Sequence, residues 1–346
     1  MTTTGALQLT GSGVVRTRVR RRDLRPDDVA VAVSHCGVCG TDLHAWHRVR
    51  SGGEPVVPGH EATGSVVAVG EAVTSLAVGE AVAVGNIVDS CGACAMCRAG
   101  QENFCERFPT LTYGGRDRLD GSTTQGLWSG LVVVREAFVH PLPAGLDPAG
   151  AAPLLCAGVT VWEPLRALGV GPGTEVAVSG VGGLGHLAVR LAAALGARVT
   201  VLTRTAAKAG QARALGAHEV VVSTDEAALA TCRGRFDVVL DTAPRAHDPA
   251  PLLRLLALDG ALCVLGALER LEVDVLDLLV GRKRLTSGGS GGLPATRELL
   301  AFCAEHGITA QVEVLPAARA AEALERLQRG DVRYRFVLDT GELAHP

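Results

Sequence analysis

One run of glycines constrains the fold of this 346-residue chain more than any other feature. Gly180-Val-Gly-Gly-Leu-Gly185 directly follows an apolar segment with strand character, Glu175–Ser179, and opens an Ala/Leu-rich segment that reaches Leu195. This is the Gly-x-Gly-x-x-Gly pattern in the strand–turn–helix context that a dinucleotide-binding turn requires. Its glycines permit a tight turn and close approach of the backbone to a pyrophosphate, which the helix N-terminus then binds. We therefore expect Gly180, Gly182, Gly183, Leu184 and Gly185 to hold a dinucleotide.

The chain after this turn alternates between strand and helix character. Short apolar runs are separated by Ala/Leu-rich stretches; these runs are Arg198–Leu202, Glu219–Val222, Phe236–Leu240 and Ala261–Leu265. Such alternation predicts an α/β fold, in which helices cover both faces of a doubly wound parallel sheet. From Ala295 to Gly330 the pattern is helical, and Tyr334–Leu338 is expected to form a closing strand.

The chain before Pro141 has a different pattern. Val/Ala/Gly-rich runs are punctuated by Gly and Pro, as is typical of strands and turns in a barrel-like domain; they are Val29–Val33, Gly64–Val69, Glu80–Val84 and Leu131–Val134. Pro141-Leu-Pro143 and Asp147-Pro148 mark the boundary between the two patterns. The length fits two domains at roughly 100–200 residues each.

Composition excludes several classes of protein. The 33 basic and 36 acidic residues give a formal charge of −3, so no basic excess indicates a nucleic-acid or membrane partner. Apolar residues make up 47% of the chain, enough for a core, yet no run approaches the ~20 apolar residues of a membrane span. Because Met1–Leu9 lacks the pattern of a signal peptide, we expect a cytoplasmic protein.

The end of the second predicted strand indicates which dinucleotide binds. An NAD site places an acidic residue there for the ribose 2′-hydroxyl, but Leu202–Lys208 contains no carboxylate. Its hydroxyl and cationic side chains suit a 2′-phosphate instead; they are Thr203, Arg204, Thr205 and Lys208. The pattern predicts NADP(H), and the alternative is that Arg204 and Lys208 are simply solvated at the start of a helix.

Four of the ten cysteines lie within fifteen residues, in the pattern Cys-x2-Cys-x2-Cys-x7-Cys; they are Cys91, Cys94, Cys97 and Cys105. In a reducing compartment this spacing favours metal ligation over disulfides. Four thiolates suit one structural Zn²⁺ in tetrahedral coordination, and an iron–sulfur cluster is the rival. Three further cysteines are scattered singly among apolar residues and are expected in the core; they are Cys232, Cys263 and Cys303.

A second metal site would have to be assembled from distant positions. Cys39 lies in Cys36-Gly-Val-Cys39-Gly-Thr41-Asp42-Leu-His44, His60 in Gly59–Gly64, and Cys156 in Pro153–Thr160. One histidine and two cysteines match the three-ligand set of a catalytic zinc, whose fourth position stays open. Spacing alone leaves the alternative that His60 is structural and Cys156 belongs to the core.

Taken together, these motifs resemble the zinc-dependent medium-chain alcohol dehydrogenases, with the cinnamyl alcohol dehydrogenase branch nearest. The similarity extends almost end to end and includes Thr124-Gln125-Gly126, Leu154–Thr160, the Gly180 turn and the ending Asp331–Asp339. It implies a GroES-like catalytic domain, residues 1–150 completed by 292–346, and a Rossmann NADP-binding domain, residues 151–291. A homodimer is also implied.

The resemblance assigns the metal ligands residue by residue. Cys39, His60 and Cys156 match the catalytic-zinc ligands, whereas Cys36 matches a position that does not bind the metal. Glu61 matches a carboxylate beside the metal, which approaches zinc when water leaves. The four cysteines from Cys91 to Cys105 match the structural-zinc lobe.

Three polar residues near Cys39 match residues that support the reaction. Asp42 corresponds to the partner that orients the ligand histidine. Thr41 corresponds to the hydroxyl that hydrogen-bonds the substrate oxygen, and His44 to the outer end of a proton relay through the nicotinamide ribose. The alternative for Thr41 and His44 is ordinary loop polarity.

The chain departs from these relatives where they carry a Phe-Ile pair that walls the substrate pocket. Gly289 and Ser290 take those positions, within the Gly-rich segment 287–292, and Gly52 and Gly53 fall in another pocket loop. We expect a wider, more flexible and more polar pocket; the alternative is that Trp46, Trp128 or a differently placed neighbouring subunit fills the gap. The segment also makes the family's usual dimer contact harder to predict.

The leading prediction is a zinc-dependent enzyme that transfers hydride between NADP(H) and an alcohol/aldehyde pair with a bulky or polar substrate. The alternative is NADPH-dependent reduction of an iminium or an α,β-unsaturated carbonyl (1,4-reduction) in a biosynthetic pathway. A third interpretation, a zinc-ribbon-like module that binds nucleic acid, is disfavoured by the acidic balance and the Gly180 turn.

Overall fold

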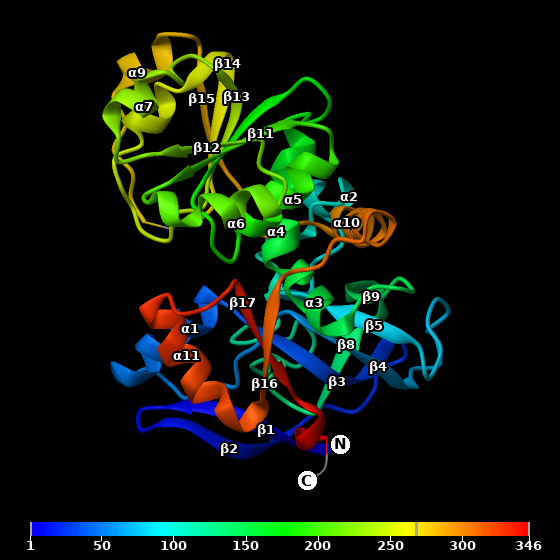
Figure 1. The fold of residues 1–346 in the computed structure, drawn as a ribbon. Helices are drawn as coiled ribbons and strands as arrows, with labels where there is room; N and C mark the ends of the chain where they lie inside the picture. The colour runs from blue at the N-terminus through cyan, green and yellow to red at the C-terminus, as the bar shows by residue number, and fades with distance from the viewer. Residues whose placement is uncertain (1, 267–268, 345–346) are drawn as a thin grey trace. The chain divides into compact units, whose positions relative to one another are not determined.

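The computed structural model describes residues 2–266 and 269–344 and divides the chain into two compact units. Residues 1–156 and 290–346 form the first unit, and residues 157–289 form the second (Figure 1). The sequence placed these boundaries at 150/151 and 291/292. In the described part of the chain no helix combines the length and apolarity that a membrane span needs; the longest, α10 (Leu293–His306), has 14 residues.

The second unit is built on a six-stranded sheet in which every pairing is parallel, in the order β12-β11-β10-β13-β14-β15. The strands are β10 (Glu175–Ser179), β11 (Arg198–Thr203), β12 (Glu219–Val222), β13 (Phe236–Asp241), β14 (Leu256–Val264) and β15 (Arg284–Ser287). Central strands of such sheets are covered on both faces, which explains why Val176, Ala177 and Val178 are all buried.

Helices connect these parallel strands, as crossover connections require. They are α5 (Gly185–Ala194), α6 (Ala209–Ala214), α7 (Glu226–Ala230), α8 (Ala250–Leu253) and α9 (Val275–Leu279), with the short 3-10 turn η4 (Ala206–Lys208); α4 (Ala157–Ala167) precedes β10. The predicted doubly wound parallel α/β sheet is confirmed.

The first unit contains a seven-stranded sheet in the order β16-β17-β3-β4-β5-β9, with β8 also paired to β3. Its strands are β3 (Asp28–Val38), β4 (Ala62–Val69), β5 (Ala81–Val84), β8 (Leu131–Arg135), β9 (Val139–Pro141), β16 (Val312–Pro316) and β17 (Arg335–Asp339). A hairpin of β1 (Thr3–Thr10) and β2 (Gly13–Arg20) and a small pair of β6 (Ile87–Asp89) and β7 (Thr110–Leu111) complete the β structure.

The helices of the first unit are short apart from three. They are α1 (Gly40–Arg50), α2 (Ala95–Arg98), α3 (Pro148–Ala151), α10 and α11 (Ala320–Arg329), with 3-10 turns η1 (Glu102–Phe104), η2 (Glu136–Phe138), η3 (Ala152–Leu155), η5 (Ala317–Arg319) and η6 (Gly341–Leu343). In α1 the buried positions are Asp42, Ala45, Trp46 and Val49, one face of a helix at the expected spacing.

The prediction of continuous helical character from Ala295 to Gly330 was wrong. Strand β16 separates α10 from α11 and pairs in parallel with β17. Since β17 in turn pairs antiparallel with β3, the two ends of the chain share one sheet, and this non-local pairing overrides the local helical preference of the segment.

Candidate active site

Four side chains of the first unit converge on one point. One donor atom from each of Cys39, His60, Glu61 and Cys156 lies within 4.8 Å of all the others. The Cys39 and Cys156 sulfurs are 3.7 Å apart, and His60 Nε2 lies 3.3 Å from the Cys156 sulfur. Three of the four residues are buried, so the cluster is shielded from solvent except at Cys156, which is partly exposed.

The backbone around Asp42 brings Cys39 and His60 together. Cys39 caps the N-terminus of α1, and its N–H donates to Asp42 Oδ2 at 2.8 Å. The N–H of Gly59 donates to Asp42 Oδ1 at 3.0 Å, and His60 Nδ1 lies 3.5 Å from the same oxygen. One buried carboxylate therefore ties the start of the helix to the loop that carries His60.

Gly59 is required by the close packing of that loop. Its φ is +92°, and a Cβ at this position would stand 2.8 Å from the backbone nitrogen of Trp128. The segment after Gln125 holds the loop through backbone hydrogen bonds, with the N–H of Leu127 donating to Gly59 O and that of Trp128 to Pro58 O. Any other residue at position 59 would push His60 out of place.

Glu61 is the cluster member with unusual electrostatics. Its side chain is fully buried, and neither carboxylate oxygen has a hydrogen-bond partner among the described residues. Burial raises the pKa of Glu61 to about 7, although the nearby Arg335 guanidinium opposes the shift. Arg335 Nη2 lies 3.6 Å from Glu61 Oε2 and is itself buried. A buried carboxylate that accepts no hydrogen bond, beside two thiols and an imidazole, fits a cation at the centre of the cluster.

The donor types also fit zinc. Thiolate and imidazole ligands suit Zn²⁺, and a His/Cys/Cys set leaves a coordination position open. Within the cluster, the hydrogen bond from Cys156 keeps the pKa of Cys39 well below its usual value, so one sulfur already favours the thiolate form.

The four cysteines from Cys91 to Cys105 form a second cluster, and their sulfurs all lie within 4.8 Å of one another. Backbone N–H groups point at them: Cys94 N donates to Cys91 Sγ at 3.4 Å, and Cys97 N donates to Cys94 Sγ at 3.4 Å. Hydrogen bonds from backbone amides of Ala93 and Cys94 lower the pKa of Cys91 to about 6. Separations of 3.4 and 3.9 Å from the Cys97 sulfur to those of Cys94 and Cys91 suit one ion at the centre. The cluster therefore fits a structural zinc better than an iron–sulfur centre.

The other cysteines do not enter either cluster. Cys232, Cys263 and Cys303 are buried in the core, as predicted. Cys36 is also fully buried, and its thiol donates to the Gly37 carbonyl oxygen rather than joining the nearby cluster.

In the second unit, the predicted dinucleotide residues gather at the carboxyl edge of the sheet. Gly180 follows β10 with a φ of +90°, Gly182 and Gly183 continue the turn, and Leu184 caps α5, which starts at Gly185. A Cβ on Gly185 would overlap the Gly180 carbonyl, so this glycine permits the close approach of helix and turn. Since β10 and β11 are parallel neighbours, the end of β11 lies at the same edge.

That strand end carries the residues predicted to distinguish the two dinucleotides. Thr203 ends β11 and is buried, whereas Arg204, Thr205 and Lys208 are exposed. The exposed cations are compatible with a phosphate ligand and with simple solvation, so the preference stays a prediction.

The structure places the two residues predicted for proton transfer on the first turns of α1. Thr41 and His44 are both exposed, and the Thr41 hydroxyl lies 3.7 Å from the Cys39 sulfur, within hydrogen-bonding distance. Among the described residues no hydrogen bond joins Thr41 to His44 directly, and their part in proton transfer stays a prediction.

Two residues of the site were missed by sequence reasoning. Arg335 belongs to the terminal Asp331–Asp339 motif, to which the sequence assigned no role, and the available signal was a charged residue within an otherwise apolar predicted strand. Tyr113 packs its ring 5.8 Å from that of His60, and nothing local marks it.

The Gly-rich segment and the two candidate tryptophans are also located. Ser290 is buried with a φ of +64°, and its hydroxyl lies 2.7 Å from Asn86 Oδ1 in the same unit. Trp46 and Trp128 are both buried in the core of the first unit.

Comparisons with known proteins agree with this arrangement. Residues 25–144 match the family "Alcohol dehydrogenase GroES-like domain", and residues 183–305 match "Zinc-binding dehydrogenase". The chain is 44% identical to a probable formaldehyde dehydrogenase AdhA of Bacillus subtilis, over 95% of this chain and 94% of the relative. It is 44% identical to the NADP-dependent alcohol dehydrogenase C 1 of Mycolicibacterium smegmatis, over 95% of each chain. A cinnamyl alcohol dehydrogenase of Sorghum bicolor superimposes with a TM-score of 0.94 at 39% identity, over 98% of each chain.

These matches and the two clusters define a zinc-binding oxidoreductase of alcohols and aldehydes. The chain belongs to the zinc-dependent medium-chain alcohol dehydrogenase family, in the branch of the cinnamyl alcohol dehydrogenases. The predicted GroES-like and Rossmann-type architecture is thereby confirmed.

Proposed function

We propose that this protein transfers hydride between NADP(H) and an alcohol/aldehyde pair at a catalytic zinc held by Cys39, His60 and Cys156. The observation that carries the proposal is the convergence of these residues with Glu61 in one buried cluster. When bound there, zinc acts as a Lewis acid on the substrate oxygen. The first unit would supply the catalytic residues and the second the dinucleotide site.

The protein's own groups would prepare this reaction. Asp42 holds the His60 ring by its Nδ1 edge, which leaves Nε2 directed at the cluster. Arg335 holds the Glu61 carboxylate from one side and balances its charge. Under this proposal the Thr41 hydroxyl, 3.7 Å from the Cys39 sulfur, would exchange a proton with the substrate oxygen, and the exposed His44 would exchange it with solvent through the nicotinamide ribose.

Metal analysis and a Cys39→Ser variant test the zinc assignment. Wild-type protein is expected to hold two zinc ions per chain and the variant one, with alcohol and aldehyde turnover lost and the secondary structure retained. The matched control is Cys36→Ser, three residues away and outside the cluster, which should keep both zinc ions. Two zinc ions and full turnover in Cys39→Ser would contradict the proposal.

The cofactor preference rests on Thr203, Arg204, Thr205 and Lys208, and on the NADP-dependent relative. We expect a higher kcat/KM with NADPH than with NADH, and Arg204→Gln should reduce it for NADPH alone. Equal values for the two cofactors in the wild-type protein would contradict this part of the proposal.

The substrate is proposed to be bulky or polar, since Gly289 and Ser290 replace two apolar residues of relatives. A panel of aldehydes and alcohols with NADPH and NADP⁺ tests this, and efficient turnover of cinnamaldehyde with rejection of larger aldehydes would argue against it. Product analysis on an α,β-unsaturated aldehyde separates the proposed 1,2-reduction from 1,4-reduction; iminium substrates complete the panel.

We further propose that the protein acts in the cytoplasm as a homodimer that uses the open edge of the second unit. Within the part of the chain that the structure describes, strand β15 pairs only with β14, and all four of its residues are exposed. Large apolar residues are exposed beside it, between 60% and 73% for Leu258, Val275, Leu276, Leu279 and Val280. An unpaired strand edge flanked by apolar side chains favours self-association. Light scattering after size-exclusion chromatography tests this, with Leu279→Glu expected to give monomers.

A further inference from the structure

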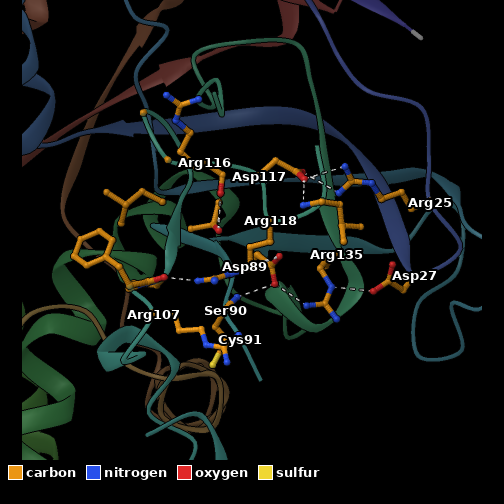
Figure 2. A pocket seen from close by; sticks show the side chains of 17 residues that line it. Arg25, Asp27, Asp89, Ser90, Cys91, Arg107, Arg116, Asp117, Arg118 and Arg135 are labelled. Carbon is orange, nitrogen blue, oxygen red and sulfur yellow. Dashed lines mark hydrogen bonds and ion pairs between the residues drawn. The ribbon is translucent and has the colours of Figure 1, made fainter. Parts of the chain in front are cut away.

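A cavity of about 870 Å³ lies beside the structural-zinc cluster, with Ser90 and Cys91 in its wall (Figure 2). Its most unusual feature is a set of five arginine side chains; they are Arg25, Arg107, Arg116, Arg118 and Arg135. Three aspartates, Asp27, Asp89 and Asp117, line the same cavity and neutralise some of these arginines.

Two of the arginines are fully engaged by carboxylates. Arg25 binds Asp117 at 2.8 Å, and Arg135 bridges Asp27 at 2.8 Å and Asp89 at 2.6 Å. Figure 2 shows these pairs along one side of the cavity. In these partly exposed ion pairs the aspartates neutralise the charges of Arg25 and Arg135, so neither arginine needs a further partner.

Arg118 is different because its partners belong to the cysteine lobe. Its Nη2 donates to the carbonyl oxygen of Phe108 and lies 4.0 Å from the Cys105 sulfur, as a hydrogen-bond donor to it. Its Nε lies 3.9 Å from Asp89 Oδ2, a carboxylate that Arg135 holds more closely. The Arg118 side chain therefore contacts three parts of the cysteine lobe. These are Asp89 at the end of β6, the ligand Cys105, and the turn at Phe108.

The turn at Phe108 explains why a tie is needed there. Phe108 has a φ of +56°, a left-handed conformation that is unfavourable for an aromatic residue, and its side chain is 69% exposed. Its N–H donates to the Cys105 carbonyl at 2.8 Å, so the conformation of this residue sets the direction of the chain at Cys105. A cationic donor on the Phe108 carbonyl stabilises that conformation.

Charge gives the second reason. Zn²⁺ with four thiolates carries a net charge of about −2, which a nearby guanidinium partly offsets. The Cys105 sulfur also accepts the N–H of Cys91 at 3.5 Å, so Arg118 supplies a second donor to the same ligand. Groups that hold and polarise metal ligands in this way typically change metal affinity by about 10–100-fold.

We propose that Arg118 is a positioning residue of the structural-zinc site, which holds the Cys105 thiolate and offsets the charge of the cluster. This rests on the assignment of zinc to the four cysteines. The matched control is Arg116, two residues away in the same cavity, which is exposed and donates to Gly121 O rather than to a sulfur.

The experiment compares zinc release from purified wild-type, Arg118→Gln, Arg118→Lys and Arg116→Gln proteins. Each protein is mixed with a chromogenic chelator, whose absorbance measures the total zinc released. The loss of enzymatic activity over the same time measures the release of the catalytic zinc, and the difference gives the structural zinc. Cobalt-substituted protein supplies a second readout, because the thiolate-to-cobalt charge-transfer band reports the ligand sulfurs directly. Thermal unfolding of each loaded variant checks that the fold is retained.

In Arg118→Gln we expect the structural zinc, whose release does not affect activity directly, to leave about 10-fold faster than in the wild type. The charge-transfer band of the cobalt-substituted variant should be altered, and the rate of release of the catalytic zinc should be unchanged. Arg118→Lys should restore slow release, since it keeps the charge, and Arg116→Gln should match the wild type. Wild-type release from Arg118→Gln, or equal rates in Arg118→Gln and Arg118→Lys, would overturn the inference. A wild-type protein with a single zinc ion would instead overturn the assignment beneath it.

Discussion

Replacement of Arg21 by methionine should destabilise the first unit without touching the reacting groups. Arg21 follows β2, and its side chain is 7% exposed. The guanidinium donates to Leu131 O at 2.8 Å, Gln125 O at 2.6 Å, and Gly126 O and Ser129 Oγ at 2.7 and 2.6 Å. No carboxylate accepts these bonds, and burial lowers the pKa of Arg21 to about 10.

The magnitude follows from the acceptors that are left behind. Arg21→Met removes the cationic donor from three backbone carbonyls, those of Gln125, Gly126 and Leu131. The Ser129 hydroxyl lies 3.0 Å from Gly126 O and 3.2 Å from Leu131 O, and its single proton can satisfy one of them. Two carbonyls that are at least partly buried then lack a donor, at about 1–3 kcal/mol each; after subtraction of the relieved burial of the cation, the net loss is about 3 kcal/mol.

Urea and thermal unfolding of zinc-loaded protein measure this loss. At about 2–4 °C per kcal/mol, the unfolding midpoint should fall by about 6–12 °C. Arg21→Lys keeps the positive charge but loses the planar guanidinium with its several donors, so its unfolding midpoint should lie between those of the wild type and Arg21→Met. Both variants should still bind two zinc ions at low temperature. A loss below about 1 kcal/mol in Arg21→Met would refute the reasoning, because it would mean that water or neighbouring groups replace the guanidinium at no cost.

Three further changes test other parts of the structure. Gly37→Ala places a Cβ 2.7 Å from Glu61 Cδ, so the carboxylate must move, and kcat/KM should fall by about 100-fold at unchanged secondary structure. Burial, with a smaller contribution from Arg297, lowers the pKa of His140 to about 3. Below pH 6.5, the usual pKa of the group, His140 is protonated in the unfolded chain but stays neutral in the folded protein. Stability should fall by about 1.4 kcal/mol per pH unit as the pH drops from about 6.5 towards 3, and urea unfolding of His140→Phe should lack this component. Gly185→Ala should raise the Kd for NADPH, measured by fluorescence titration, while both zinc ions remain bound; an unchanged Kd would mean that the turn can move away from the helix.

Sequence reasoning succeeded where the relevant geometry is local. The Gly180 turn and the alternating segments after it define a parallel sheet because each depends on residues close together in the chain. It failed between Ala295 and Gly330, where β16 forms only because β17 offers it a partner. It also failed to predict helix α1, whose buried face depends on packing against the core.

The same distinction holds for the two clusters of metal-binding residues. The cysteines from Cys91 to Cys105 lie in one loop, so their spacing alone indicated a shared ion and favoured structural zinc, and the short sulfur separations in the structure agree with that prediction. Cys39 and Cys156 are 117 positions apart, and spacing left their partnership as one of several alternatives until the resemblance was added.

The sequence by itself therefore determined the dinucleotide turn, the parallel sheet and the four-cysteine loop, because short-range spacing and periodicity dictate such geometry. The resemblance assigned His60, Glu61 and Cys156 to the site of Cys39, and the tertiary structure brings one donor atom of each within 4.8 Å of the others. Only the tertiary structure decided that Arg335 from the far end of the chain faces Glu61 and that Arg118 reaches Cys105. Contacts of this kind depend on how β17 joins β3 and how loops pack, and no local pattern encodes the result of that packing.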